Sequence, residues 1–178
     1  MEALKATAYH EAGHAVMAWI QKVRLKGASI IADKDSAGHC LHEKLLKIRE
    51  GGLLLTPRGR DCGEKHILIC LAGGVAQTQF NPQGTRRSHM QADWDEAAAV
   101  ALVLNNGDGK GTGIYLEWLV HRAKNLIALR QNWLLVEAVA PELFCKTKLT
   151  GREVEALIRQ SYDDQLLRQK KQVKENRL

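Results

Sequence analysis

Apolar residues recur at helical spacing along most of this chain. Alanine and larger apolar side chains repeat every three or four positions over residues 2–23, 62–79, 88–104 and 114–138, and the pattern resumes near residue 149. Residues at this spacing line one face of an α-helix, and that face packs against a protein core. The pattern therefore predicts a mainly α-helical domain in which the helices form a bundle.

The segment after the first predicted helix has a different pattern. Residues 28–32 and 39–42 have the composition of short strands, and the turn-forming residues 33–38 lie between them, which predicts a small β-hairpin. A free strand edge beside an active site can bind an extended peptide through backbone hydrogen bonds. Ile30 and Ile31 are the candidate edge positions, although a purely structural hairpin explains the same residues equally well.

Glycine, proline and other turn-forming residues mark the connections. Residues 45–60 predict an irregular connection, and the glycine-rich residues 105–113 predict a flexible link between helices. Pro141 is expected to mark the point at which the next helix begins. Thr150 and Glu153 have the spacing of a capping box, which predicts the start of the last helix.

Composition and length point to an ordinary globular protein. The 178 residues fit one domain, which we expect over residues 1–160, followed by a basic helix end or tail over residues 161–178. No apolar run approaches the roughly 20 residues of a membrane span, so we expect a soluble, cytoplasmic protein. The four cysteines are widely spaced and form no CxxC pair, which predicts reduced thiols and no second zinc site.

The net charge of +6 raises the question of nucleic-acid binding. The basic residues are spread thinly, except in the tail at residues 168–177. A charged chain end of this kind is usually a solvated segment. The charge pattern therefore does not favour nucleic acid as a partner, although docking of the tail on an acidic molecule is a weaker alternative.

The most informative motif is HEAGH at residues 10–14. On a helix, His10 and His14 stand on one face, one turn apart, and can ligate a single zinc ion. Glu11 lies beside them, where a carboxylate can act as general base toward a zinc-bound water. The alternative is a pair of core histidines with ordinary hydrogen-bond partners. We favour a zinc site, because leaving such polar groups unpaired in a core costs roughly 2 kcal/mol or more.

A catalytic zinc site needs a third protein ligand. The extended motif HExxHxxGxxH does not supply it, because Met17 and Ile20 stand at its glycine and third-histidine positions. Glu43 and Glu64 are possible downstream carboxylates, but they fall at the end of the predicted hairpin and near the start of a predicted helix. Asp93, beside the apolar stripe of its own helix, is the better candidate.

Other polar residues near these candidates have simpler explanations. His39 and His42 are three apart in a predicted strand, so they face opposite sides and are not expected to be ligands. Asp93, Asp95 and Glu96 together suit the positive end of a helix dipole. Helix capping is therefore the alternative to a zinc-ligand role for Asp93.

Five segments within residues 5–160 follow the order and spacing of a known family. They are AYHEAGHAV at residues 8–16, ASII at 28–31, LAGGVA at 71–76, ADWDEA at 92–97 and LTGREV at 149–154. They resemble the protease domain of the FtsH-type ATP-dependent zinc metalloproteases. The resemblance implies a mostly helical bundle with a small hairpin next to the zinc site, with His10, His14 and Asp93 as zinc ligands and Glu11 as the catalytic base.

The chain also departs from that family. It contains no ATPase module, and Val75 stands where the family usually has arginine. We therefore expect a stand-alone zinc metalloendopeptidase that hydrolyses peptide bonds of flexible or unfolded proteins through a zinc-bound water. A separate AAA+ ATPase that delivers substrates is compatible with the resemblance. The alternative is a catalytically silent FtsH-like adaptor that binds peptides or a partner ATPase.

Overall fold

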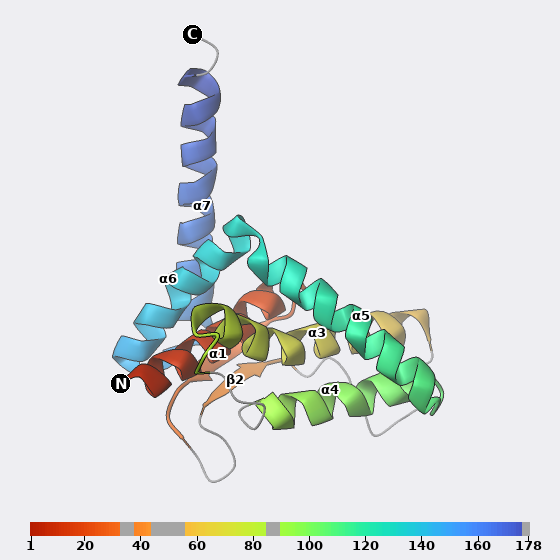
Figure 1. The fold of residues 1–178 in the computed structure, drawn as a ribbon. Coiled ribbons are helices and arrows are strands. Elements are labelled where there is room, and N and C mark those ends of the chain that lie inside the picture. Colours follow the sequence, from red (N-terminus) through yellow and green to blue (C-terminus); the bar gives the residue numbers. More distant parts are fainter. Residues whose placement is uncertain (33–37, 44–55, 85–89, 176–178) are drawn as a thin grey trace.

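The computed structural model describes residues 1–32, 38–43, 56–84 and 90–175. Within these residues the chain is mainly helical, with a small antiparallel sheet (Figure 1). The predicted helical class with a small hairpin is confirmed at this level. None of the described helices combines the length and apolar character of a membrane span.

Two helices form the centre of the fold. They are α1 (Glu2–Ile20) and α3 (Pro57–Phe80), which pack against each other through mostly buried small and apolar residues (Figure 1). A Cβ atom at Gly13 would lie 2.6 Å from the backbone oxygen of Ala72. Because real Cβ atoms do not approach a backbone oxygen that closely, the packing of α1 on α3 requires glycine at this position.

Four further helices complete the described fold. They are α4 (Gln91–Leu104), α5 (Gly109–Ala128), α6 (Arg130–Lys146) and α7 (Gly151–Glu175). Both α4 and α5 pack on α3, while α6 packs on α1 and α7 packs on α6. The C-terminal part of α7 extends away from the rest of the chain (Figure 1). The predicted tail at residues 161–178 is thus helical as far as Glu175.

The sheet has the strand order β2-β1-β3. Its strands are β1 (Leu25–Ser29), β2 (His39–His42) and β3 (Lys148–Thr150), and β1 pairs antiparallel with both neighbours. The predicted hairpin is formed by β1 and β2. The third strand was not predicted, because three residues between two helices are too few to show an alternating pattern.

The predicted position of the first strand is wrong by about three residues. Ile30 and Ile31 follow β1 instead of lying within it. The backbone N–H of Ile30 donates to the oxygen of Thr147, and β1 is paired on both sides. Ile30 and Ile31 therefore do not form a free edge; among the described residues the two outer edges of the sheet belong to β2 and β3. Residues 33–37 of the turn predicted over residues 33–38 lie outside the described residues.

The start of α3 also differs from the prediction. Thr56 caps this helix by accepting a hydrogen bond from the N–H of Gly59, and Pro57 occupies the first turn. Proline is well suited to that turn, because its missing N–H has no partner there in any helix. Residues 57–60 are therefore helical, and residues 44–55 of the predicted irregular connection lie outside the described residues.

The long helix predicted over residues 114–138 is divided into α5 and α6. Leu129 has an extended backbone conformation (φ −57°, ψ 125°) between them, and a break of one residue leaves the helical spacing of apolar residues almost unchanged. The predicted link over residues 105–113 is shorter than expected, because α5 begins at Gly109. Pro141 lies inside α6 and does not mark the start of a helix.

Two further predictions concern the start of α7 and the buried face of α4. Thr150 and Glu153 form the predicted capping box, with the Glu153 N–H donating to Thr150 Oγ1 and the Thr150 N–H donating to Glu153 Oε2. In α4, Trp94 falls at the helical spacing of Ala97 and Ala101 and would be expected on their apolar stripe, but it is 42% exposed while those two residues are buried. The predicted helix start at Ser88 lies outside the described residues.

Candidate metal centre

His10 and His14 lie on the buried side of α1, facing α3 and α4. Their Nε2 atoms are 2.9 Å apart. Asp93, in the first turn of α4, directs Oδ2 to within 2.9 Å of His10 Nε2 and 3.4 Å of His14 Nε2. The structure therefore brings together the three residues that the sequence suggested as ligands, although Asp93 follows His10 by 83 residues along the chain.

The opposite nitrogen of each ring is held from behind by a group on α3. His10 Nδ1 lies 2.9 Å from Oε1 of Gln77, and His14 Nδ1 lies 2.6 Å from the backbone oxygen of Ile69. Both partners are acceptors, so each Nδ1 carries the ring hydrogen and donates it. In the neutral rings the lone pairs of both Nε2 atoms therefore point toward each other and toward the Asp93 carboxylate. The two Nε2 atoms and Asp93 Oδ2 are then three hydrogen-bond acceptors that face one another, and they need a cation between them.

Zinc fits this set of donors. Ligand atoms about 2.0–2.1 Å from a tetrahedral zinc ion are about 3.3 Å from one another, close to the observed separations of 2.9 to 3.4 Å. Gly73 on α3 leaves the necessary room, because a Cβ atom there would lie 2.7 Å from His10 Nε2 and closer still to His14 Nε2. His10, His14 and Asp93 would therefore be the residues that hold the ion.

A proton takes the place of this cation in the metal-free protein. Burial lowers the pKa of His14, but the charge of Asp93 and its hydrogen bond outweigh that effect and raise the pKa to about 9. Burial raises the pKa of the Asp93 carboxyl, but the facing histidines outweigh that effect and hold the pKa well below its ordinary value. The metal-free site is thus an ion pair between a histidine and Asp93.

Glu11 is buried next to this cluster, with 4% of its surface exposed. Its Oε2 atom has no hydrogen-bond partner among the described residues. Burial raises the pKa of the Glu11 carboxyl, and the nearby His14 and His10 only partly oppose that shift. A carboxylate with a free oxygen and a raised pKa is suited to accept a proton from a water molecule.

Strand β2 lies beside the same cluster. A Cβ atom at Gly38, just before β2, would lie 2.9 Å from Oε1 of Glu11. Burial raises the pKa of the Cys40 thiol, and the charges of Glu11 and Asp93 add to that effect, so this thiol is also close to the centre. Of the two strands whose outer edges are unpaired among the described residues, β2 is therefore the one that lies next to Glu11.

The other carboxylates considered from the sequence do not join the cluster. Glu43 is exposed beyond the end of β2. Glu64 accepts hydrogen bonds from the Tyr115 hydroxyl at 2.8 Å and from Arg122 at 3.2 Å, and it thereby connects α3 to α5. Neither belongs with His10 and His14 in the groups of potential ligands that the described residues form.

Sequence reasoning missed Gln77, and it identified Gly73 only as part of the LAGGVA segment at residues 71–76, without a role beside the two histidines. Gln77 and Gly73 are one turn apart on α3, so they lie on the same face of that helix. A glycine and a glutamine at this spacing carry no recognisable metal motif. The backbone oxygen of Ile69 leaves no signal in the side-chain sequence at all.

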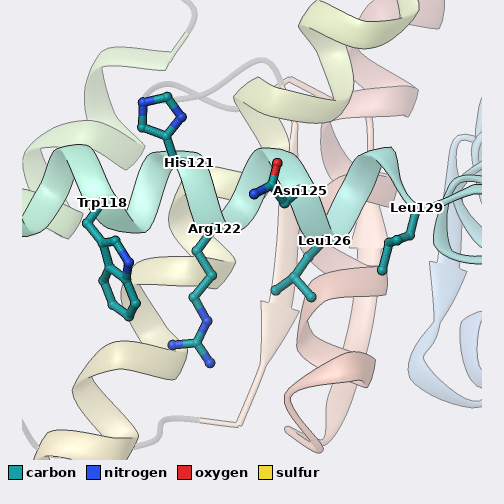
Figure 2. A pocket seen from close by; sticks show the side chains of 6 residues that line it. All are labelled: Trp118, His121, Arg122, Asn125, Leu126 and Leu129. Atoms are coloured by element: carbon teal, nitrogen blue, oxygen red, sulfur yellow. The ribbon is translucent and has the colours of Figure 1, made fainter.

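A surface cavity of about 430 Å³ lies elsewhere, on the outside of α5. Figure 2 shows that its lining side chains come from this helix and from Leu129, the residue that follows it; those on the helix are Trp118, His121, Arg122, Asn125 and Leu126. The guanidinium of Arg122 lies over the Trp118 ring, 5.4 Å from its centroid. This hollow contains neither the histidine pair nor Asp93, so it is separate from the candidate metal centre.

The centre combines two imidazoles, one carboxylate and a buried base. This donor set can hold one divalent cation and leave a fourth position for water, as in catalytic zinc sites. A comparison of the chain with protein-family models finds no match, and neither does a comparison with curated proteins. The assignment of this centre as a metal site therefore depends on the chemistry and geometry of its residues alone.

Proposed function

We propose that this chain is a zinc-dependent endopeptidase that hydrolyses peptide bonds of flexible or unfolded proteins. The observation that carries the proposal is the convergence of His10 Nε2, His14 Nε2 and Asp93 Oδ2, with both Nδ1 atoms hydrogen-bonded to acceptors. The burial of Glu11 beside them supports it further. A structural zinc site would usually have four protein ligands and would need no such base.

The roles of the residues follow from their chemistry. His10, His14 and Asp93 would hold the zinc ion. Zinc, when bound, polarises a carbonyl group and lowers the pKa of a water molecule. Glu11 would take the proton of the attacking water and return it to the leaving amine nitrogen, and its raised pKa makes it better able to hold that proton between the two steps.

The sheet supports a peptide as the substrate. The outer edge of β2 is unpaired among the described residues, and an extended chain can add to such an edge through its backbone. Only a segment without stable structure can do so, which favours flexible or unfolded substrates. We further propose that the fold is of the FtsH peptidase type, as the order of the sequence segments suggests, and that a separate AAA+ ATPase delivers folded substrates.

The test compares Glu11→Gln with the wild type. Glutamine keeps the size of the side chain but cannot accept the proton, so the variant should bind zinc normally and lose at least about 10²-fold in turnover of casein. Glu2→Gln is the matched control, because Glu2 is exposed on the same helix and its replacement should leave turnover unchanged.

One result would exclude the protease and leave the adaptor alternative. A zinc-loaded wild type that cleaves neither casein nor a varied peptide library, alone or with candidate ATPases, has no such activity. If Glu11→Gln also leaves the binding of partner proteins unchanged, the Glu11 carboxylate acts neither as a general base nor in partner binding. Wild-type cleavage that survives Glu11→Gln would instead overturn the role assigned to Glu11.

A further inference from the structure

A second group of potential metal ligands lies between α3 and α4, apart from the histidine pair. His66 and Cys70 are one turn apart on α3, and Glu96 is one turn beyond Asp93 on α4. One ligand atom from each of His66, Cys70 and Glu96 lies within 4.8 Å of the other two. The wide spacing of the cysteines predicts no second zinc site, because it considers cysteines alone, whereas this group combines a histidine and a cysteine of α3 with a carboxylate of α4.

The contacts in this group converge on one ring nitrogen. Glu96 Oε1 lies 2.9 Å from His66 Nε2, and Cys70 Sγ lies 3.6 Å from the same nitrogen. A catalytic cysteine with a histidine base would need the carboxylate on the opposite ring nitrogen, where it could orient the ring. The shared nitrogen therefore argues against a nucleophilic cysteine and for three donors that face a common point.

We propose that His66, Cys70 and Glu96 form a second binding site for a divalent transition metal ion, with zinc as the expected occupant. Tetrahedral zinc with a Zn–S bond of about 2.3 Å holds sulfur and nitrogen ligands about 3.5 Å apart, and the observed separation is 3.6 Å. Thiolate and imidazole donors favour zinc over magnesium or calcium. One thiolate and one carboxylate also balance the two positive charges of the ion.

The site is buried on the side of Cys70 and His66 and open to solvent on the side of Glu96. Cys70 is buried, and the His66 side chain is 12% exposed, whereas the Glu96 side chain is 56% exposed. An ion can therefore enter past Glu96, and a water molecule can complete its coordination from that side. On binding, the Cys70 S–H bond breaks, a sulfur–metal bond forms, and the proton passes to solvent.

The ion would act on the first centre through α4. It would join α3 to α4 at Glu96, three residues after Asp93, and so restrict movement of the helix that carries Asp93. This makes His66, Cys70 and Glu96 positioning residues for the first centre, with no contact to a substrate required. The second site goes beyond the proposed function, since it can exist whether or not the chain is a protease.

Cobalt titration of the metal-free 178-residue chain separates the two centres. The first centre has no sulfur ligand, so a thiolate-to-cobalt charge-transfer band in the near ultraviolet can come only from a cysteine site. The wild type should show this band, and His14→Ala should keep it. Cys70→Ser and His66→Ala should lose it, and the zinc content should fall from about two ions per chain to about one in Cys70→Ser.

Three cysteine variants serve as controls. Cys40→Ser, Cys62→Ser and Cys145→Ser should all keep the band, and Cys40 is the most important of them because it lies near the first centre. If Cys70→Ser does not fold, Glu96→Gln tests the same site from the exposed side and should weaken cobalt binding at least about 10-fold.

Two results would overturn the second site. One is a folded wild type without the charge-transfer band at saturating cobalt. The other is a band that survives Cys70→Ser or disappears in Cys40→Ser, which would assign the thiolate to another cysteine. Failure of the proposed protease activity would have a different signature, because it would leave the band and its loss in Cys70→Ser unchanged.

Discussion

His10 Nδ1 and Gln77 Oε1 lie 2.9 Å apart, and this contact joins α1 to α3 directly behind the candidate metal centre. Because the amide oxygen accepts, the ring hydrogen stays on Nδ1 and the lone pair of Nε2 is directed at His14 and Asp93. A histidine ligand whose second nitrogen is held in this way is fixed in both tautomer and orientation. The sequence motif identifies His10 as a ligand, and Gln77 on α3 determines that Nε2 is the ring nitrogen available to the metal ion.

The first prediction concerns this partner. Gln77→Ala removes the acceptor behind His10, so zinc affinity should fall about 10- to 100-fold, as measured by competition with a chelator. Gln77→Glu keeps an acceptor and should retain most of the affinity. Gln79→Ala is the matched control, because Gln79 is exposed on the same helix. Equal affinities for all three variants would show that Gln77 does not support the centre.

A second prediction concerns the space beside the two rings. A methyl group at residue 73 would lie 2.7 Å from His10 Nε2, so Gly73→Ala should abolish tight zinc binding. The atoms that the methyl group would meet belong to side chains and not to the backbone, and alanine favours a helix by about 1 kcal/mol over glycine, so the variant should still fold. In Gly113→Ala the added methyl group meets nothing within 4 Å, and this control should bind zinc normally. Zinc content after gel filtration decides the outcome.

Proton release on zinc binding is the third prediction. The pKa of His14 in the metal-free protein is about 9, above its ordinary 6.5, so zinc must displace a proton at neutral pH. Apparent zinc affinity should therefore rise with pH and level off above about 9. Calorimetry in buffers of different ionisation enthalpy counts the protons released, and no release at neutral pH would contradict the prediction.

The same pKa shift makes the stability of the metal-free protein depend on pH. A raised pKa in the folded state stabilises the fold fully below pH 6.5, and that contribution is lost as the pH rises through about 9. The lowered pKa of Asp93 acts at the other end, where its contribution disappears as the pH falls below 3.8 and through the folded value. Thermal unfolding with a chelator present should therefore show decreasing stability between pH 6.5 and 9.

A further prediction concerns the start of α7. Thr150 Oγ1 accepts the N–H of Glu153, and loss of such a cap costs about 1 kcal/mol. Thr150→Ala should lower the free energy of unfolding by that amount, while Thr150→Ser should restore most of it. Denaturant unfolding measures both variants, and equal stabilities for wild type and Thr150→Ala would show that the capping box contributes nothing.

Some parts of this fold could be predicted from the sequence because they depend on local signals. The capping box is a contact across three residues, and HEAGH is a spacing along one helix. The division at Leu129 and the strand β3 (Lys148–Thr150) depend on tertiary packing, which the apolar pattern does not record. The same reasoning applies to Ile30, whose backbone partner is Thr147, more than a hundred residues away.

The residues of the candidate site likewise fall into those that local sequence signals predict and those that only the packing of helices brings together. His10, His14 and Glu11 can be recognised on one helix turn, and Asp93 can be suggested from its place on a later helix. Gln77 could not be recognised, because its contact with His10 exists only after α3 packs on α1. A motif therefore identifies ligands, whereas the groups that orient those ligands depend on the packing of helices.

The last prediction concerns the edge of β2 as the peptide-binding strand. Along an edge strand of an antiparallel pair, alternate residues direct their backbone N–H toward the neighbouring strand and toward solvent. Cys40 and Leu41 are adjacent in β2, so one of them presents its N–H to the unpaired side. Proline at that position removes a donor for the substrate but no hydrogen bond of the sheet.

We therefore expect one of the variants Cys40→Pro and Leu41→Pro to fold and to bind zinc like the wild type. Loss of one backbone hydrogen bond of about 1 kcal/mol should raise its KM for an extended peptide about 5-fold. Leu41→Ala is the control for the loss of a side chain that is 53% exposed, and it retains the backbone donor. An unchanged KM in the folded proline variant would mean that the substrate does not add to β2, and that it reaches Glu11 from another side of the centre.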